Sequence, residues 1–156
     1  MITAVDTNVL LDIFGADPRF GERSAQAMKR SLAEGAVVAC AVVWAETGAG
    51  FPDEDTFCEA MKTLGVGFSG LSQEVGLRAA SAWRQYRASG GKRERVAADF
   101  LIGAHAAVAC NRLLTRDRAF IGAISRASLL WTPRDSRDQP RPKLIVTAGG
   151  TTDGPG

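Results

Sequence analysis

Residues 1–14, MITAVDTNVLLDIF, decide the fold class, because a strand pattern there gives way to a helix pattern at a single acidic residue. The run ITAV is short and rich in β-branched residues, which favour strands. From Thr7 onward the apolar residues recur at helical spacing, and Thr7 and Asn8 are candidate caps. Asp6 is therefore expected at the carboxyl end of a first strand, immediately before a helix.

The rest of the chain repeats this alternation of strand and helix patterns. Helices are expected over residues 17–34, around Glu46, and over residues 53–64, 72–89, 96–110 and 120–124. Strands are expected over residues 36–43, 66–71, 113–115 and 129–132, and LIV at 144–146 could add an edge strand. Such alternation is typical of an α/β fold with a central, mostly parallel sheet flanked by helices, in which ligand sites form beyond the carboxyl ends of the strands.

Length and composition indicate one globular domain. The chain has 156 residues, of which 46% are hydrophobic and 23% are charged, and this fits a single domain with a sizeable core. The composition changes at Pro133, so a folded domain over residues 1–133 and a Pro/Gly-rich tail over residues 134–156 are expected. The sequence has no basic leader and no run of about 18 apolar residues, which predicts a cytoplasmic protein without a membrane span.

Charge is distributed unevenly along the chain. The net charge is +2, but residues 1–76 carry 5 Lys/Arg against 11 Asp/Glu, and residues 77–156 carry 14 against 6. The two halves therefore have net charges of −6 and +8. Solvated helix faces could account for this difference. A C-terminal half rich in arginine also makes a polyanion a plausible partner, because arginine matches phosphate geometry with two parallel hydrogen bonds.

Four acidic residues each stand in an otherwise apolar segment. The segments are AVDTNVLL, VVWAETGAG, VAADFLIGAHAA and LLTRDRAF, and their acids are Asp6, Glu46, Asp99 and Asp117. Taken singly, Asp6 or Asp117 could be a helix cap, and Glu46 could pair with an arginine. Asp99 is harder to explain in this way, because it lies in the first turn of an almost uncharged helix that must be largely buried.

In order, size and spacing these four segments resemble the PIN-domain family, most closely the VapC-type toxins of bacterial toxin–antitoxin pairs. The opening VDTNVLL and the late LLTRDRAF are the more specific pieces. The resemblance runs from about Met1 to Pro133 and implies a PIN-like nuclease domain over residues 1–133. It makes the four acids the catalytic residues and Asn8 and Thr115 supporting polar groups near them.

The resemblance also implies that Asp6, Asp99 and Asp117 hold Mg²⁺ or Mn²⁺, and the chemistry of the residues agrees. Hard divalent cations take oxygen ligands, and a group of buried acids is tolerable only with a cation among them. His105 is the only histidine, so a mechanism with two histidines is excluded, and it is expected to be a satisfied core residue. Cys40, Cys58 and Cys110 stand far apart in apolar surroundings and are expected to be buried thiols, neither a disulfide frame nor a zinc site.

These observations together predict a Mg²⁺- or Mn²⁺-dependent endoribonuclease that hydrolyses RNA with metal-activated water. One alternative is a catalytically idle PIN fold that only binds RNA or protein. A more distant alternative is a phosphatase with Asp6 as its nucleophile, but such enzymes want a second acid two positions later, where this chain has Asn8.

The sequence predicts an RNA substrate and two kinds of protein partner. The RNA-binding candidates are the basic residues around Asp99 and Asp117, namely Lys92, Arg93, Arg95, Arg116 and Arg118. By resemblance to VapC-type toxins, the chain is expected to form a homodimer and to be silenced by a cognate antitoxin. Phe14, Phe20, Trp44 and Phe51 are more large apolar groups than the N-terminal helices need, so some of them should line a groove for that partner.

Overall fold

A parallel sheet of five strands forms the centre of the computed structural model, which describes residues 1–91, 97–117 and 143–146. The strands run in the order β3-β2-β1-β4-β5, and every neighbouring pair is parallel. Their bounds are β1 Ile2–Val5, β2 Ala36–Cys40, β3 Val66–Ser69, β4 Arg112–Thr115 and β5 Lys143–Val146. This arrangement confirms the expected α/β fold with a mostly parallel sheet.

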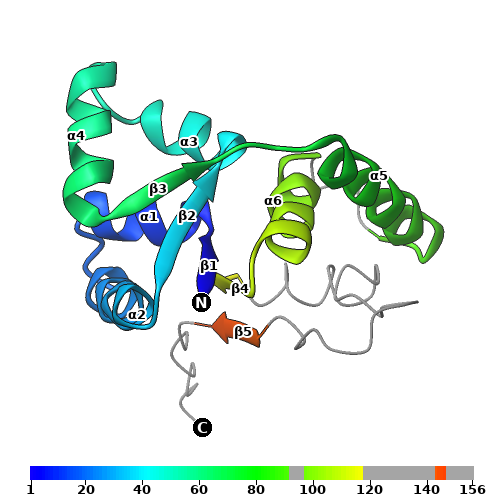
Figure 1. Cartoon of the computed structure of the whole chain (residues 1–156), viewed down its shortest axis with the longest axis horizontal. Coiled ribbons are helices and arrows are strands. Elements are labelled where there is room, and N and C mark those ends of the chain that lie inside the picture. Colours follow the sequence, from blue (N-terminus) through cyan, green and yellow to red (C-terminus); the bar gives the residue numbers. More distant parts are fainter. Residues whose placement is uncertain (92–96, 118–142, 147–156) are drawn as a thin grey trace, which may run out of the picture.

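Six helices flank the sheet in the described part of the chain. Their bounds are α1 Thr7–Phe14, α2 Gly21–Ala33, α3 Ala41–Gly48, α4 Glu54–Leu64, α5 Gln73–Ala88 and α6 Ala97–Ala109. Figure 1 shows α5 and α6 together at one side of the sheet and α1, α2 and α4 toward the other. None of these described helices is both long and apolar enough to cross a membrane.

Local sequence signals set several of these boundaries. The side chain of Asp53 accepts a hydrogen bond from the backbone N–H of Thr56 and so caps α4, while Ser72 does the same for α5 through Val75. Helix α4 ends at Gly65, whose φ of +81° lies in the left-handed region that favours glycine. The predicted ends of these two helices are therefore confirmed.

Two predicted boundaries are wrong by several residues. The strand expected over residues 36–43 stops at Cys40, and the apolar residues after it begin α3, because a short apolar run fits a buried strand and a buried helix equally well. The helix expected from residue 17 begins at Gly21. Asp17 instead accepts hydrogen bonds from the backbone N–H groups of Arg19 and Phe20, which forms a turn before α2.

The tail and the cysteines differ in part from expectation. Strand β5 lies within the expected tail of residues 134–156 and confirms the edge strand at 144–146. The helix expected over 120–124 and the strand expected over 129–132 lie outside the described residues. Cys40 is buried, but Cys58 is exposed and Cys110 is only half-buried. Cys58 lies on the exposed side of α4, next to the exposed Glu59.

Candidate functional site

The carboxyl ends of β1 and β4 bring the first site residues together. These strands pair in register, with Val5 opposite Leu114, and the backbone N–H of Asp6 donates to the carbonyl oxygen of Leu114 over 3.0 Å. Asp6 therefore leaves the sheet beside Thr115, the last residue of β4. Asp6 and Thr115 are 109 positions apart in the sequence, and they become hydrogen-bonding partners because parallel strands end at the same edge of the sheet.

Asp6 is held by two hydrogen bonds to one of its carboxylate oxygens. The Thr115 hydroxyl donates to Oδ2 over 2.6 Å, and Nδ2 of Asn8 donates to the same oxygen over 2.7 Å. The Thr115 hydroxyl also accepts from Asn8 Nδ2 at 3.2 Å and from the backbone N–H of Asp117 at 3.1 Å. Its one donor and two acceptor positions are thus all used, which fixes the orientation of the Asp6 carboxylate.

Asp117 is placed by the segment that follows β4. The backbone N–H of Asp117 donates to the Thr115 hydroxyl. The backbone N–H of the preceding residue, Arg116, donates to Oδ1 of Asn8 over 3.1 Å. Asn8 therefore bridges the start of α1 and the end of β4, with its amide nitrogen on Asp6 and its amide oxygen on the chain leading to Asp117. Asp117 itself is half-buried.

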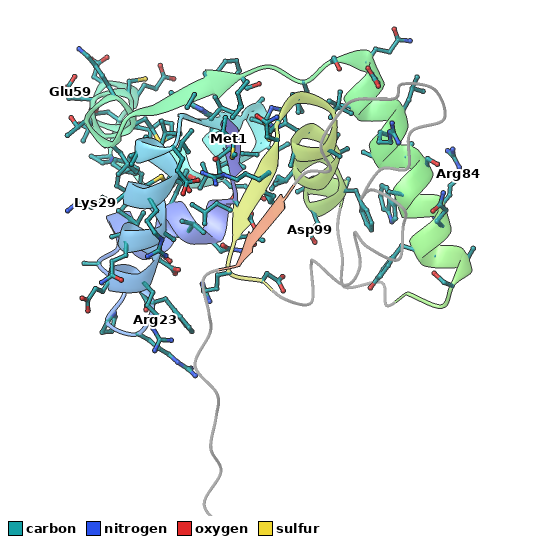
Figure 2. All side chains as sticks on the ribbon, turned by 60° about the horizontal axis from the view of Figure 1, so that its bottom comes forward. Met1, Arg23, Lys29, Glu59, Arg84 and Asp99 are labelled. Atoms are coloured by element: carbon teal, nitrogen blue, oxygen red, sulfur yellow. The ribbon has the colours of Figure 1, made fainter. Side chains whose placement is uncertain are left out.

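Asp99 enters from a helix on the other side of the sheet. It lies in the first turn of α6 and is half-buried, at the end of that helix seen in Figure 2. The next residue, Phe100, is buried and stacks on Trp83 of α5, with ring centroids 5.9 Å apart and planes 15° apart. Tyr86 packs on the same ring at 5.5 Å. Aromatic packing between α5 and α6 therefore fixes the position of Asp99.

The electrostatics of Asp6 report the proximity of the other acids. Burial, followed in effect by the charges of Asp99 and Asp117, raises the pKa of Asp6 to about 6, against the lowering effect of hydrogen bonds from Thr115 and the Thr7 backbone. Asp6 is only 7% exposed, so its charge is costly at neutral pH. A cation beside the three carboxylates would offset this cost.

Glu46 lies at the border of this group. It is exposed on α3, and its Oε2 accepts a hydrogen bond of 2.5 Å from the hydroxyl of Thr7, the residue after Asp6. Its charge is not among those that shift the pKa of Asp6. The structure therefore links Glu46 to the site through Thr7, whereas the charges of Asp99 and Asp117 act directly on Asp6.

The comparisons with known proteins agree with this geometry. The family model described as "PIN domain" matches residues 3–123, which is most of the chain. The chain belongs to the PIN-domain family. No curated protein sequence matches the chain at a significant level.

Three solved structures share the PIN fold of this chain. The first is VapBC2 from Rickettsia felis bound to a DNA fragment from their promoter, with a TM-score of 0.64 and 15% identity, covering 79% of this chain and 93% of that one. The second is a toxin–antitoxin complex from Klebsiella pneumoniae, with a TM-score of 0.60, 20% identity and coverages of 80% and 93%. The third is FitAcB from Neisseria gonorrhoeae, with a TM-score of 0.58, 23% identity and coverages of 80% and 94%. These likenesses bear out the resemblance to VapC-type toxins at the level of fold.

The acidic edge of this PIN domain fits a hard divalent cation by the chemistry of its donors. Within residues 1–91, 97–117 and 143–146, no three acidic, histidine or cysteine side chains lie close enough to form a complete ligand set. Magnesium usually takes only one or two direct carboxylates and completes its shell with waters and substrate phosphate oxygens. Asp6, Asp99 and Asp117 supply carboxylate oxygens around one buried negative charge, so they remain the candidate ligands.

The structure of this PIN domain confirms one further sequence prediction and leaves another, the RNA-binding residues, as a prediction. His105 is buried, and its Nε2 lies 2.8 Å from the Ser69 hydroxyl, which confirms a satisfied core histidine. Burial lowers the pKa of His105 and so favours the neutral imidazole. Of the RNA-binding candidates, Arg116 is described, and the others, Lys92, Arg93, Arg95 and Arg118, lie outside the described residues.

Sequence reasoning missed three residues around the candidate site, namely Thr7, Asp12 and Ser24. Thr7 carries the bond to Glu46, and Asp12 with Ser24 forms a buried polar contact beside Arg116. Asp12 could have been found, because Val9, Leu10 and Asp12 are the buried residues of α1, and a carboxylate on the apolar side of a helix needs a polar or cationic partner. The pattern alone does not say which residue that partner is.

Proposed function

We propose that this PIN domain is a Mg²⁺- or Mn²⁺-dependent endoribonuclease and the toxin of a type II toxin–antitoxin pair. The observation that carries the proposal is the environment of the Asp6 carboxylate. It is buried at the carboxyl end of β1, oriented by Asn8 and Thr115, and within electrostatic reach of Asp99 and Asp117. Buried like charges raise the free energy of the metal-free protein, and a site that binds a cation accounts for their being together.

The catalytic roles follow from where each side chain lies. When bound, the divalent cation supplies an activated water and neutralises charge on the phosphate. Asp6, Asp99 and Asp117 would bind it, and Asn8 and Thr115 keep the Asp6 carboxylate in one orientation. Glu46 is exposed and held by Thr7, and its charge does not shift the pKa of Asp6, so its proposed role is to orient a water or the RNA backbone at the edge of the site.

The remaining side chains leave little room for other hydrolytic mechanisms. His105 is the only histidine in the chain, and its Nε2 is engaged by Ser69 inside the protein, away from solvent. A phosphatase with Asp6 as nucleophile would need a second acid at position 8. Asn8 occupies that position and donates a hydrogen bond to Asp6 Oδ2, which makes the carboxylate oxygen less nucleophilic.

The substrate class follows from charge. The C-terminal half has a net charge of +8, and the candidates Lys92, Arg93, Arg95 and Arg118 lie close in sequence to Asp99 or Asp117. Single-stranded or looped RNA is the proposed substrate, bound through its phosphates. Neutralising Lys92, Arg93 and Arg95 together should weaken RNA binding and flatten its salt dependence without changing metal affinity. An unchanged salt slope would contradict this part of the proposal.

The antitoxin is proposed to cover an apolar groove beside α4. Phe14, at the end of α1, lines a cavity of about 650 Å³ together with Thr56, Glu59, Ala60, Thr63 and Leu64 of α4. The lining combines the apolar side chains of Phe14, Ala60 and Leu64 with the acidic Glu59, and Glu54 and Asp55 lie in the first turn of the same helix. A basic amphipathic segment of the antitoxin fits both features. Trp44 and Phe51, also considered for this groove, pack against Phe57 in the described structure.

The test is cleavage of a single-stranded RNA by the purified chain. We expect cleavage with Mg²⁺ or Mn²⁺, none in excess chelator, and recovery when the metal is added back. The same assay with the co-purified product of an adjacent gene should show inhibition.

Cleavage that survives chelation would contradict the metal mechanism, and metal binding without cleavage would favour the idle RNA- or protein-binding module. A monomeric chain that is harmless when expressed, with no adjacent partner gene, would contradict the toxin and homodimer assignments.

A further inference from the structure

Arg116, the residue before Asp117, forms an ion pair with the buried carboxylate of Asp12. Nε of Arg116 is 3.0 Å from Oδ2 of Asp12, although its N–H does not point at that oxygen, so the contact is an ion pair and not a directed hydrogen bond. The Asp12 side chain is 3% exposed and that of Arg116 is 32% exposed. The Ser24 hydroxyl of α2 donates to the same oxygen of Asp12 over 2.8 Å. Three elements of the fold therefore meet at one carboxylate.

An aromatic ring completes the enclosure of the arginine. The guanidinium carbon of Arg116 lies 4.3 Å from the ring centroid of Phe20, just before α2. A guanidinium at this distance over an aromatic face is attracted by the ring. The side chain of Arg116 is thus bound on one side by Asp12 and on another by Phe20. Most of its surface is already covered by the protein.

The chain around Arg116 is tied to the candidate site at three successive positions. The Thr115 hydroxyl binds Asp6, the backbone N–H of Arg116 binds Asn8, and the backbone N–H of Asp117 binds Thr115. These ties all come from residues of the site itself. Asn8 joins this segment to the first turn of α1, and the ion pair with Asp12 adds a second tie further along the same helix.

We propose that Arg116 and Asp12 are positioning residues for the metal site, and that their ion pair fixes the backbone that presents the Asp117 carboxylate to Asp6. This inference rests on the proposed function, and it gives Arg116 a role other than the RNA contact that its charge and sequence position predict. Asp12 cannot rotate away without exposing its charge to the core, so it holds Arg116 in one place. The position of Asp117 follows, since it is the next residue along the chain.

Arg112 provides a matched control at the other end of the same strand. It is the first residue of β4, it is buried, and it binds Thr3 and Glu34 near the amino ends of the strands. A loss of metal binding caused by general loosening of β4 would follow from replacing either arginine. A loss caused by misplacing Asp117 would follow only from replacing Arg116 or its partner Asp12.

The experiment compares Arg116→Met, Asp12→Asn, the double variant and Arg112→Met with the wild type. In metal-free protein, the backbone amides of residues 116 and 117 should exchange hydrogen faster in the first three variants, as followed by NMR. Their affinity for Mn²⁺, measured by calorimetry, should fall about 10- to 100-fold, as is usual when a group that orients a metal ligand is removed. The double variant should lose no more than the worse single variant, because both replacements break one pair. Arg112→Met should keep wild-type Mn²⁺ affinity.

RNA cleavage kinetics separate positioning from substrate binding. Positioning predicts a lower kcat with little change in KM for Arg116→Met, and the same result for Asp12→Asn. Unchanged Mn²⁺ affinity with a raised KM would make Arg116 a phosphate contact and overturn the inference, as would equal losses of metal affinity in the Arg116→Met and Arg112→Met proteins. If Arg116→Met does not fold, the isosteric Asp12→Asn carries the test by the same criteria.

The same experiments distinguish a failure of the proposed function from a failure of the positioning role. A wild type that binds Mn²⁺ but cleaves no RNA would contradict the nuclease proposal, and the exchange and affinity data would still decide the positioning role. A wild type that cleaves RNA, with normal Mn²⁺ affinity in the Asp12→Asn and Arg116→Met proteins, would contradict the positioning role alone.

Discussion

The two ends of β4 carry the same kind of contact in different places. Arg112 opens the strand, is 4% exposed, and donates from Nε to the Thr3 hydroxyl over 2.6 Å while its guanidinium pairs with Glu34. Arg116 follows the strand and pairs with Asp12. Both arginines tie one strand to the layer of α1 and α2. Only the second lies at the carboxyl edge, beside Asp6 and Asp117, so position along the strand separates a purely structural pair from one that can affect chemistry.

The two pairs also differ in the acid that remains when the arginine is removed. Arg116→Met leaves Asp12 buried with only the Ser24 hydroxyl as a described partner, and should reduce the free energy of unfolding by about 3–5 kcal/mol. Arg112→Met leaves Glu34, whose side chain is 52% exposed and can turn to water, so a loss nearer 1 kcal/mol is expected. Urea denaturation measures both values. Equal losses would show that burial of the acid does not distinguish the two pairs.

Asp6 extends the comparison to a buried acid with no cationic partner in the described structure. Its pKa is raised from 3.8 to about 6, so the folded state binds the proton more tightly than the unfolded chain. The resulting stabilisation is complete below about pH 3.8 and is lost as pH rises through about 6, where ionised Asp6 costs up to about 3 kcal/mol. Asp6→Asn should therefore be more stable than the wild type at pH 8 in chelator. Denaturation across pH 4–8 measures the difference, and a less stable variant at pH 8 would contradict this account.

The buried imidazole of His105 can be compared with the buried carboxylates of Asp6 and Asp12. Burial lowers its pKa below 6.5, so stability should fall as pH drops below 6.5 and level off once the folded-state pKa is passed. His105→Gln should remove this part of the pH dependence while keeping a hydrogen bond to Ser69 within reach. The measurement is the change in unfolding free energy between pH 7 and pH 5, relative to the wild type. An unchanged difference would mean that His105 does not titrate in this range.

The smallest effect is expected at the exposed rim. Thr7→Val removes the hydrogen bond to Glu46, which is exposed and can bind water instead. The unfolding free energy should change by less than about 1 kcal/mol. RNA cleavage should fall more clearly, since Glu46 loses its fixed orientation. A stability loss as large as that of Arg116→Met would place Thr7 among the structural residues.

The placement of several candidate site residues could be predicted because it depends on where strands end. Asp6, Asn8 and Thr115 lie in short segments whose apolar patterns identify β1 and β4, and parallel strands bring such ends to one edge. Asp99 could be singled out because a charge in an apolar helix needs a reason. These inferences use only local pattern and the rule of parallel sheets.

What could not be predicted depends on how elements pack. The pairing of Asp12 with Arg116 requires the rotation of α1 about its axis and its distance from the end of β4, and neither follows from spacing in the sequence. The contacts of Arg116 with Asp12 and Phe20 could not be predicted either, and its candidacy for RNA contact stays a prediction. The start of α3 at Ala41 was missed because Val42 and Val43 suit a strand as well as a buried helix.

The most direct test of the account is RNA cleavage by wild-type protein and by Asp6→Asn across a titration of Mg²⁺ or Mn²⁺. We expect metal-dependent cleavage by the wild type and none by Asp6→Asn at any metal concentration, in a variant that is folded and more stable in chelator than the wild type. Arg112→Met, away from the carboxyl edge, should retain metal-dependent cleavage. Cleavage by folded Asp6→Asn at the wild-type rate would contradict the central role of Asp6 and with it the proposed metal site.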